Sequence, residues 1–236
     1  MVKKKGKWMT MSNAKFYKVG GYVRDKLLGV KSHDIDYACE CESYDAMREA
    51  IIARGCSIKL EKPEYLTIRA VEPKVGGVDF VLCRKDGAYT DGRRPESVEA
   101  GTILDDLARR DFTMNAMALS DEGNLIDPFG GKRDLELRLL RCVGDAEIRM
   151  REDKLRLLRA IRFSIVKGFT IGFDIEEILM DKRFTFDGVS ADRIRDELFK
   201  CFEHDTPQTL RSINYWPALK GIFEKHPIKL TPVVIH

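Results

Sequence analysis

Residues 18–37, KVGGYVRDKLLGVKSHDIDY, place a Gly-Gly pair fourteen residues ahead of an Asp-x-Asp motif. Side chains two positions apart on a strand share one face, so we expect Asp34 and Asp36 to project together. Two neighbouring carboxylates stay ionised only where a cation neutralises them, and their hard oxygens suit Mg²⁺. The motif by itself is also typical of a solvated strand edge, so its neighbours decide between the two interpretations.

The residues around the motif favour a phosphate ligand. Gly20 and Gly21 allow a ligand such as a triphosphate to approach the backbone closely, and Arg24 supplies positive charge to it. Further along, Asp79 alternates with apolar residues in GVDFVLC. It is either a third carboxylate of the same site or a polar residue on a half-buried strand.

Composition excludes several other classes of protein. The 236 residues are 44% apolar and 33% charged, with a net charge of +3, which is ordinary for a globular protein. The six cysteines form no C-x-x-C pair and the four histidines do not cluster with them, so we predict no zinc site and a cytoplasmic protein. No apolar stretch reaches the ~20 residues of a membrane span, and no apolar region follows the basic start, so we predict neither a membrane segment nor a signal peptide.

The order of the predicted elements separates a mixed first part from a helical second part. Up to about residue 140, strand-like and helical segments alternate, with Gly76 and Gly77 expected in the turn between two strands. From Glu147 onward the pattern is helical. The expected elements are strands at 15–21, 34–40, 65–71, 77–84 and 124–131, and helices at 22–29, 43–55, 105–110, 152–168, 190–204 and 207–225, the last broken near Pro217. We predict an α+β head domain of residues 1–140, followed by an all-α neck domain of residues 141–236.

Two further segments concentrate charged side chains. Residues 109–116, RRDFTMNA, are compatible with an ion-paired helix end capped by Asn115. In residues 151–163, REDKLRLLRAIRF, the leucines fall on one helical face, and the charged residues fall on the other. Helical ion pairs would explain one Asp–Arg pair, whereas three arginines in register favour an anionic ligand. These charged residues are Glu152, Asp153, Arg156, Arg159 and Arg162.

Five motifs together resemble a known family. VGGYVRDKLLG with DIDY, DGRRP, RRDFTMNA, DPFGGKRDL and EDKLRLLRAIRF follow the order of class II nucleotidyltransferases, over roughly residues 16–200. That group comprises the bacterial-type CCA-adding tRNA nucleotidyltransferases and the related poly(A) polymerases. The resemblance implies a nucleotidyltransferase head, with a mixed β-sheet flanked by helices, and a helical neck.

The resemblance also implies a role for each motif. Asp34 and Asp36 would hold the metal ions that activate an RNA 3′-hydroxyl, with Asp79, five positions before Arg84, as a further acidic catalytic residue. Residues 91–95 resemble a loop that shifts during nucleotide addition. The residues implied to contact the nucleotide are Gly20, Gly21 and Arg24 at the triphosphate, Arg109, Arg110, Asp111 and Asn115 at the ribose and phosphates, and Glu152, Asp153, Arg156 and Arg159 in the selecting helix.

The chemistry of the selecting helix explains which bases it would accept. Adenine and cytosine both present an amino donor beside a ring-nitrogen acceptor, whereas guanine and uracil present the reverse. An accepting Asp153 and a donating Arg156 therefore match A and C, and leave buried groups unpaired with G or U, at about 1–3 kcal/mol each.

The predicted activity is addition of CMP and AMP, the CCA end, from CTP and ATP to the 3′ end of tRNA with Mg²⁺. The alternatives are poly(A) or A-only addition to RNA, and a catalytically silent RNA- or nucleotide-binding module. Members of the family usually continue well past the point where this chain stops, at His236. The chain is therefore expected to be a minimal enzyme, a partial chain, or a polypeptide that needs a partner chain or an oligomer.

Overall fold

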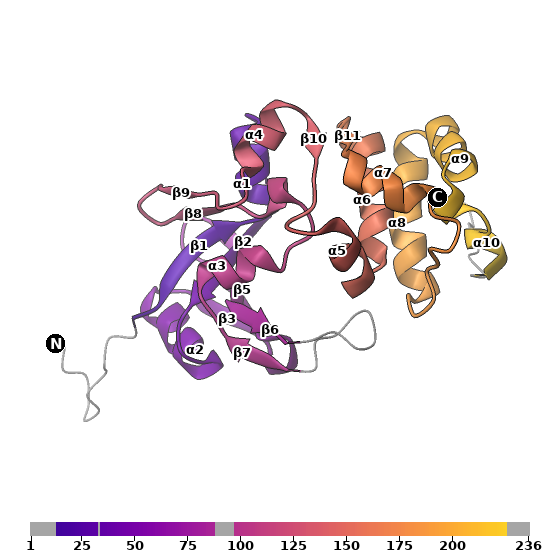
Figure 1. Cartoon of the computed structure of the whole chain (residues 1–236). Helices are drawn as coiled ribbons and strands as arrows, with labels where there is room; N and C mark the ends of the chain where they lie inside the picture. Colours follow the sequence, from indigo (N-terminus) through magenta and orange to yellow (C-terminus); the bar gives the residue numbers. More distant parts are fainter. Residues whose placement is uncertain (1–12, 33, 88–96, 226–236) are drawn as a thin grey trace, which may run out of the picture. The chain divides into compact units, whose positions relative to one another are not determined.

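The computed structural model describes residues 13–32, 34–87 and 97–225 (Figure 1). Contacts divide the chain into two compact units. The first comprises residues 1–87, 97–110 and 115–129, and the second comprises residues 88–96, 111–114 and 130–236. Each unit is described by itself. The predicted boundary after residue 140 stays a prediction.

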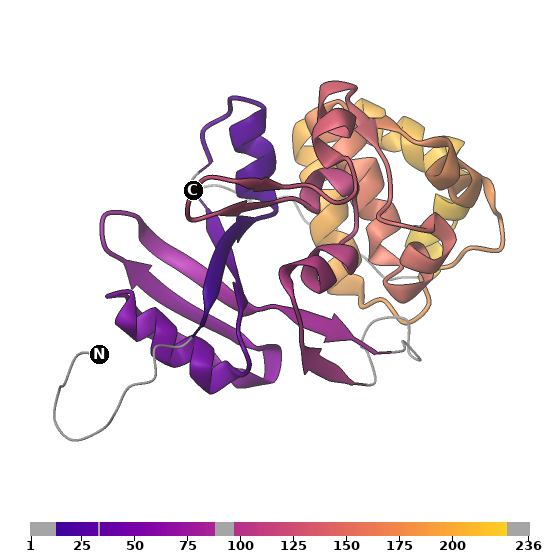
Figure 2. The ribbon, with the colours of Figure 1, turned by 60° about the vertical axis from the view of Figure 1, so that its left-hand side comes forward.

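A seven-stranded sheet forms the first unit, in the order β3-β4-β5-β2-β1-β8-β9 (Figures 1 and 2). β2 and β5 pair in parallel, and the other neighbours pair antiparallel, so the sheet is mixed as predicted. A separate antiparallel pair joins β6 and β7. The strands are β1 Lys15–Val19, β2 Ile35–Glu40, β3 Ser57–Lys62, β4 Thr67–Glu72, β5 Gly76–Leu82, β6 Arg84–Asp86, β7 Val98–Ala100, β8 Ala118–Ser120 and β9 Leu125–Ile126.

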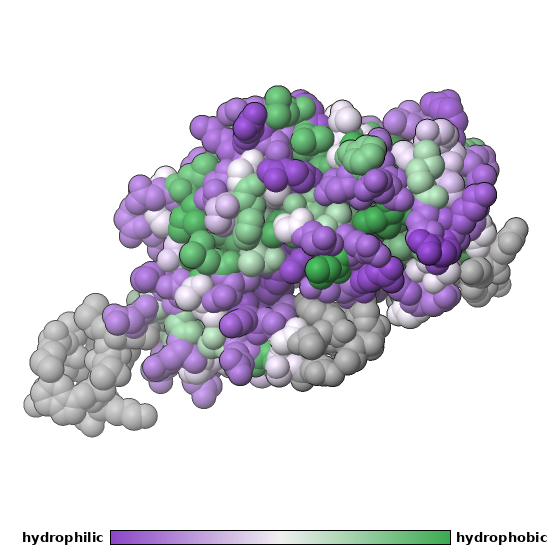
Figure 3. Space-filling model, in the orientation of Figure 1, coloured by the Kyte–Doolittle hydropathy of each residue, from purple (hydrophilic) through white to green (hydrophobic). Residues whose placement is uncertain are grey.

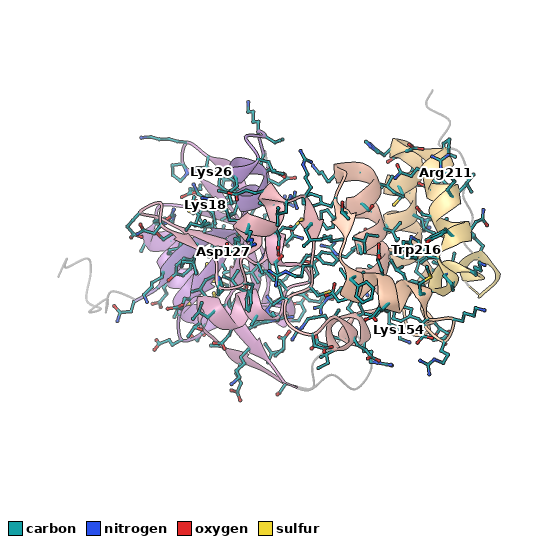
Figure 4. All side chains as sticks on the ribbon, turned by 45° about the horizontal axis from the view of Figure 1, so that its top comes forward. Lys18, Lys26, Asp127, Lys154, Arg211 and Trp216 are labelled. Atoms are coloured by element: carbon teal, nitrogen blue, oxygen red, sulfur yellow. The ribbon has the colours of Figure 1, made fainter. Side chains whose placement is uncertain are left out.

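The helices of this unit are α1 Gly21–Leu27, α2 Tyr44–Ala53 and α3 Ile103–Ala108. α2 begins where predicted, because the Ser43 side chain accepts a hydrogen bond from the Ala46 backbone N–H. Next to α1, the Lys18 ammonium lies 5.2 Å from the centre of the Tyr22 ring, where a cation is attracted to the π face (Lys18 is labelled in Figure 4).

One face of the sheet and α2 form the core of this unit. Met47 and Ile51 of α2 are fully buried together with Tyr37 and Phe80 of the central strands. The Tyr37 and Phe80 rings are stacked, with centroids 5.0 Å apart. Because this face is closed by apolar packing, polar residues that alternate with the core residues on β2, β4 and β5 lie on the other face.

The turn before β5 corrects one expectation. Gly76 and Gly77 are the first residues of β5, and the turn lies at residues 73–75. The Val75 N–H donates to the Glu72 carbonyl at 3.2 Å, which closes the turn one position earlier than the glycines suggested. Gly76 has φ 107°, a backbone angle that favours glycine at the strand start.

The second unit is helical, as predicted, apart from a two-residue parallel pair between β10 and β11. In Figure 3, hydrophilic residues cover much of its visible surface, with apolar residues between them. None of the helices in the described part of the chain is long and apolar enough to cross a membrane. The elements are α4 Gly131–Glu136, β10 Leu139–Leu140, α5 Ala146–Glu152, α6 Leu155–Lys167, β11 Thr170–Ile171, α7 Phe173–Met180, α8 Ala191–His204, α9 Thr206–Tyr215 and α10 Ile222–Lys225.

The helix predicted over residues 152–168 is interrupted near its start, which corrects a second expectation. α5 ends at Glu152, Asp153 is extended, and α6 begins at Leu155. The Asp153 side chain accepts a hydrogen bond from the Leu155 N–H at 3.2 Å, so it competes with the helical backbone and starts a new helix. The apolar face of α6 is buried as predicted, at Leu155, Leu157, Leu158, Ile161 and Ile165.

The sheet core yields a stability prediction. Phe80→Ala removes a fully buried ring and leaves a cavity beside Tyr37, so the free energy of unfolding should fall by about 3–5 kcal/mol. Leu60→Ala, at a side chain that is 48% exposed on edge strand β3, is the control and should change it by less than about 0.5 kcal/mol. Urea denaturation of both variants measures the difference, and equal losses would contradict the assigned core.

Candidate active site

Three carboxylates gather on the face of the first unit's sheet that lies opposite α2. The parallel register of β2 and β5 places Asp36 directly opposite Asp79. Asp34 precedes β2 by one residue, two positions from Asp36. The Asp34 and Asp36 side chains are exposed and Asp79 is half-buried. The sheet therefore brings together the three acidic residues that the sequence singled out.

The charge of this group is partly uncompensated. Partial withdrawal from water and the negative charges of Asp79 and Asp34 raise the pKa of the Asp36 carboxyl, against the opposing charges of Arg110 and Arg69. Within residues 13–32, 34–87 and 97–225, no set of three or more His, Cys, Asp or Glu side chains is placed to hold a metal ion. Asp34 and Asp36 therefore remain a pair of candidate ligands, with Asp79 beside them.

The Gly-Gly turn packs against two guanidinium groups. Gly20 has φ 65°, and a Cβ there would lie 3.0 Å from Arg110 Nη1. A Cβ at Gly21 would lie 3.5 Å from Arg24 Nη2. The two glycines thus leave room for arginines, a role that the sequence did not indicate beside the expected approach of a phosphate.

Arg24 itself is a buried residue with protein partners. It is 8% exposed and donates from Nη1 to Asn115 Oδ1 at 2.8 Å and from Nε to Asp25 Oδ1 at 2.9 Å. Asn115 in turn accepts a bond from Arg110 Nη1 on its backbone carbonyl, at 3.3 Å. Asn115 therefore joins the two arginines beside the glycines, where the sequence left it as either a helix cap or a ligand contact.

Asp106 holds the two arginines that follow it and was missed by sequence reasoning. It is 1% exposed, with Oδ1 accepting from Arg109 Nε at 3.1 Å and Oδ2 accepting from Arg110 Nη2 at 2.9 Å. Burial alone would raise the pKa of Asp106, but the two guanidinium groups hold it below its usual value. The sequence did contain a signal for it, because Asp106 lies three residues before Arg109 and four before Arg110, the spacing of side-chain pairs on a helix.

The R-R-D motif is divided between the units, since Arg109 and Arg110 belong to the first and Asp111 to the second. Within the second unit, Arg159 donates to Asp111 Oδ2 from Nε at 2.9 Å and from Nη2 at 2.7 Å. Burial would lower the pKa of Arg159, but Asp111 and the charge of Glu197 raise it above its usual value. This arginine is firmly cationic and is oriented by Asp111.

The charged face of α6 is largely buried. Arg156 and Arg162 have side chains 11% and 15% exposed, which excludes a simple solvated face. Arg156 Nη1 donates to Glu152 Oε2 and to the Arg149 carbonyl, both at 2.9 Å. Arg162 Nε lies 2.5 Å from Glu197 of α8. The arginines that were expected to meet an anionic ligand thus have carboxylate partners within the protein.

Asp153 is held from α8. Arg193 Nη2 donates to Asp153 Oδ2 at 2.7 Å, while Asp153 Oδ1 accepts from the Leu155 backbone. Arg193 and Glu197 lie four residues apart on α8, and sequence reasoning assigned neither to the site. Elsewhere on this unit, Lys154, labelled in Figure 4, donates to the Asp187 carbonyl at 3.0 Å. In the first unit, Arg84 pairs with Asp86 at 2.8 Å. The predicted loop at 91–95 lies outside the described residues.

The family model described as Poly A polymerase head domain matches residues 16–141. The chain belongs to this family. The resemblance seen in the sequence is therefore confirmed, and the nucleotidyltransferase fold of the head with it. Enzymes of the poly(A) polymerase head-domain family are nucleotidyltransferases, which typically use a divalent metal ion.

Individual relatives agree with the family. The chain is 37% identical over 214 residues to a CCA-adding enzyme of Geobacillus thermodenitrificans, covering 89% of this chain and 52% of that protein. It is 40% identical over 188 residues to a CCA-adding enzyme of Oceanobacillus iheyensis, covering 79% of this chain and 46% of that protein. The chain thus spans about half the length of the curated relatives it matches.

Solved structures of CCA-adding enzymes are also similar to this chain, which again covers about half of their length. A Bacillus stearothermophilus CCA-adding enzyme in complex with CTP is 30% identical with a TM-score of 0.72, over 87% of this chain and 49% of that one. A Thermotoga maritima CCA-adding enzyme complexed with tRNA is 28% identical with a TM-score of 0.69, over 93% of this chain and 50% of that one.

The raised pKa of Asp36 predicts that its negative charge destabilises the metal-free fold. At pH 7 with a chelator present, Asp36→Asn should raise the melting temperature. The free energy of unfolding should rise by the few tenths to ~1 kcal/mol typical of like charges that face each other across neighbouring strands. The gain should vanish below about pH 4, where the wild-type carboxyl is itself neutral. Glu49→Gln, on the exposed face of α2, is the control and should change little. A lower melting temperature for Asp36→Asn at pH 7 would contradict the charge assignment.

Proposed function

We propose that this chain adds CMP and AMP from CTP and ATP to the 3′ end of tRNA without a nucleic-acid template, in the cytoplasm. The observation that carries the proposal is the placement of Asp36 opposite Asp79, with Asp34 beside them, on the same unit as the Gly-Gly turn and its arginines. The relatives named CCA-adding enzymes support the reaction, and the solved complexes with CTP and with tRNA support the substrates.

Asp34 and Asp36 are the residues that would hold Mg²⁺. Their donor set fits this ion, because both supply hard carboxylate oxygens at an exposed position, and because the negative charges of Asp79 and Asp34 add to partial withdrawal from water in raising the pKa of Asp36. When bound, the metal would lower the pKa of the RNA 3′-hydroxyl and stabilise charge on the α-phosphate. Asp79 adds negative charge beside the pair and strengthens its attraction for cations.

The arginines beside the glycines would bind the triphosphate. The Gly20–Gly21 turn would lie beside the bound phosphates, and Arg24 and Arg110, which pack against these glycines, would supply the positive charge. Arg109 and Asn115 complete the set toward phosphates and ribose. Asp106 keeps Arg109 and Arg110 in one orientation before a ligand arrives, which lowers the entropy lost on binding.

Asp153 and Arg156 would select the base in the second unit, with Glu152, Asp111 and Arg159 beside them. Each carboxylate oxygen of Asp153 accepts one bond in the structure and retains a second lone pair. It can therefore accept the amino group of cytosine or adenine without losing its existing partners. Arg156, oriented by Glu152, would donate to the ring nitrogen of the same base.

The metal assignment predicts the effect of two substitutions. Asp34→Ala and Asp36→Ala should each lower nucleotide addition by several orders of magnitude, because charge stabilisation at the metal is a large part of catalysis. The assay supplies Mg²⁺, CTP and ATP to tRNAs lacking CCA, CA or A, with Glu49→Gln as control. Near-normal turnover by both alanine variants would exclude this site. Poly(A) or A-only addition would instead extend RNA with ATP alone and ignore CTP, and absent products with the wild type would indicate a silent binding module.

Base selection predicts a change in nucleotide preference. Asp153→Ala and Arg156→Ala should each weaken incorporation of A and C relative to U and G by roughly 5- to 150-fold, the equivalent of about 1–3 kcal/mol per lost pairing. Arg195→Gln is the control, since Arg195 lies on α8 near Arg193 but pairs with Asp192 on the exposed side. Incorporation of all four nucleotides is compared. An unchanged preference in both alanine variants would exclude a reading role for this pair.

A further inference from the structure

A row of charged side chains crosses the face of the sheet opposite α2 and ends at the candidate metal ligands. Arg69 of β4 lies opposite Asp79 of β5, which lies opposite Asp36 of β2. Arg69 faces away from the core, because its neighbours Ile68 and Ala70 are fully buried against α2. Residues in register on adjacent strands share a face, so the guanidinium and both carboxylates point to the same side of the sheet.

The contact is direct. Arg69 Nε lies 3.4 Å from Asp79 Oδ1, with the two side chains 61% and 35% exposed. Neither sequence motifs nor the family resemblance pointed to Arg69. Its position one strand away from Asp79 follows only from the antiparallel pairing of β4 and β5.

The other nearby cation is already engaged. The charge of Arg110 acts on Asp36, but its guanidinium donates to the buried Asp106 from Nη2 at 2.9 Å and to the Asn115 carbonyl. Arg69, by contrast, has Asp79 as its ion-pair partner in the described part of the chain. Arg69 is therefore in ion-pair contact with the carboxylate of β5, and its charge adds to that of Arg110 at the carboxylate of β2.

We propose that Arg69 is an internal counter-ion for this acidic face, and that a divalent cation must compete with it for Asp79 and its neighbours. The proposal rests on the proposed function, because it takes Asp34 and Asp36 as metal ligands. Arg69 acts through Asp79 and is a positioning residue. It occupies Asp79 in the metal-free chain and weakens metal binding there.

The competition predicts opposite effects on the metal-free and metal-bound protein. Arg69→Gln removes one of the positive charges that oppose the carboxylates, so the melting temperature in a chelator should fall. The same loss should tighten binding of Mn²⁺, a spectroscopic probe for Mg²⁺, by roughly two- to fivefold, the range expected for removal of an exposed ion pair. Arg69→Lys keeps the charge and should restore the wild-type values in part.

The test titrates Mn²⁺ into the full chain without nucleotide or RNA and measures free Mn²⁺ by electron paramagnetic resonance, with melting temperature as the second readout. Arg48→Gln is the matched control, because it removes an exposed Arg–Glu ion pair of similar length, 3.1 Å, between α2 and β3 of the same unit. It should leave the Mn²⁺ affinity unchanged. Asp36→Ala serves as the reference that removes a ligand.

The outcomes separate the two proposals. Tighter Mn²⁺ binding in Arg69→Gln and weaker binding in Asp36→Ala support the counter-ion role. Unchanged or weaker binding in Arg69→Gln, with Asp36→Ala still defective, overturns it and leaves the metal site intact. A raised KM for CTP in Arg69→Gln at unchanged Mn²⁺ affinity also overturns it, in favour of a nucleotide contact. Unchanged Mn²⁺ binding in Asp36→Ala overturns the proposed metal site and the counter-ion role together.

Discussion

The parallel pairing of β2 with β5, within an otherwise antiparallel sheet, is the constraint on which the first unit depends. Closed on one side by α2, the sheet must turn every second residue of these strands to its other face. Asp36 and Asp79 therefore lie opposite each other although their like charges repel. The apolar core stabilises the fold, and the fold holds together carboxylates that would otherwise separate. Because these carboxylates are held close together, the site attracts cations.

Buried carboxylates orient the long arginine side chains of both units. Asp106 binds Arg109 and Arg110 in the first unit, and Glu197 binds Arg162 in the second. Burying such charges is costly unless they are paired, and removal of one partner leaves the other unpaired. Paired guanidinium groups lose little further freedom when an anionic ligand binds. The same pairings thus serve both the stability of each unit and the order of its binding groups.

Membership of the poly(A) polymerase head-domain family, together with relatives named CCA-adding enzymes, supports the proposed transfer of nucleotides to RNA. The residues proposed for it divide by task. In the proposal, those of the first unit would bind metal and phosphates, and those around the start of α6 would select the base. The interruption at Asp153 matters for the second task, because an extended residue presents its carboxylate differently from one inside a helix.

Local patterns were sufficient for much of this protein. The Gly-Gly turn, the Ser43 cap and the leucine face of α6 could be predicted because each depends on residues within one or two turns of chain. The sequence by itself also identified Asp34 and Asp36 as candidate site residues, and the family resemblance added the Arg-Arg pair. Only the tertiary structure decided that Arg69 meets Asp79, that Arg193 holds Asp153, and that Glu197 receives Arg162. Partners on separate strands or helices are set by sheet register and helix packing, which no spacing along the chain encodes.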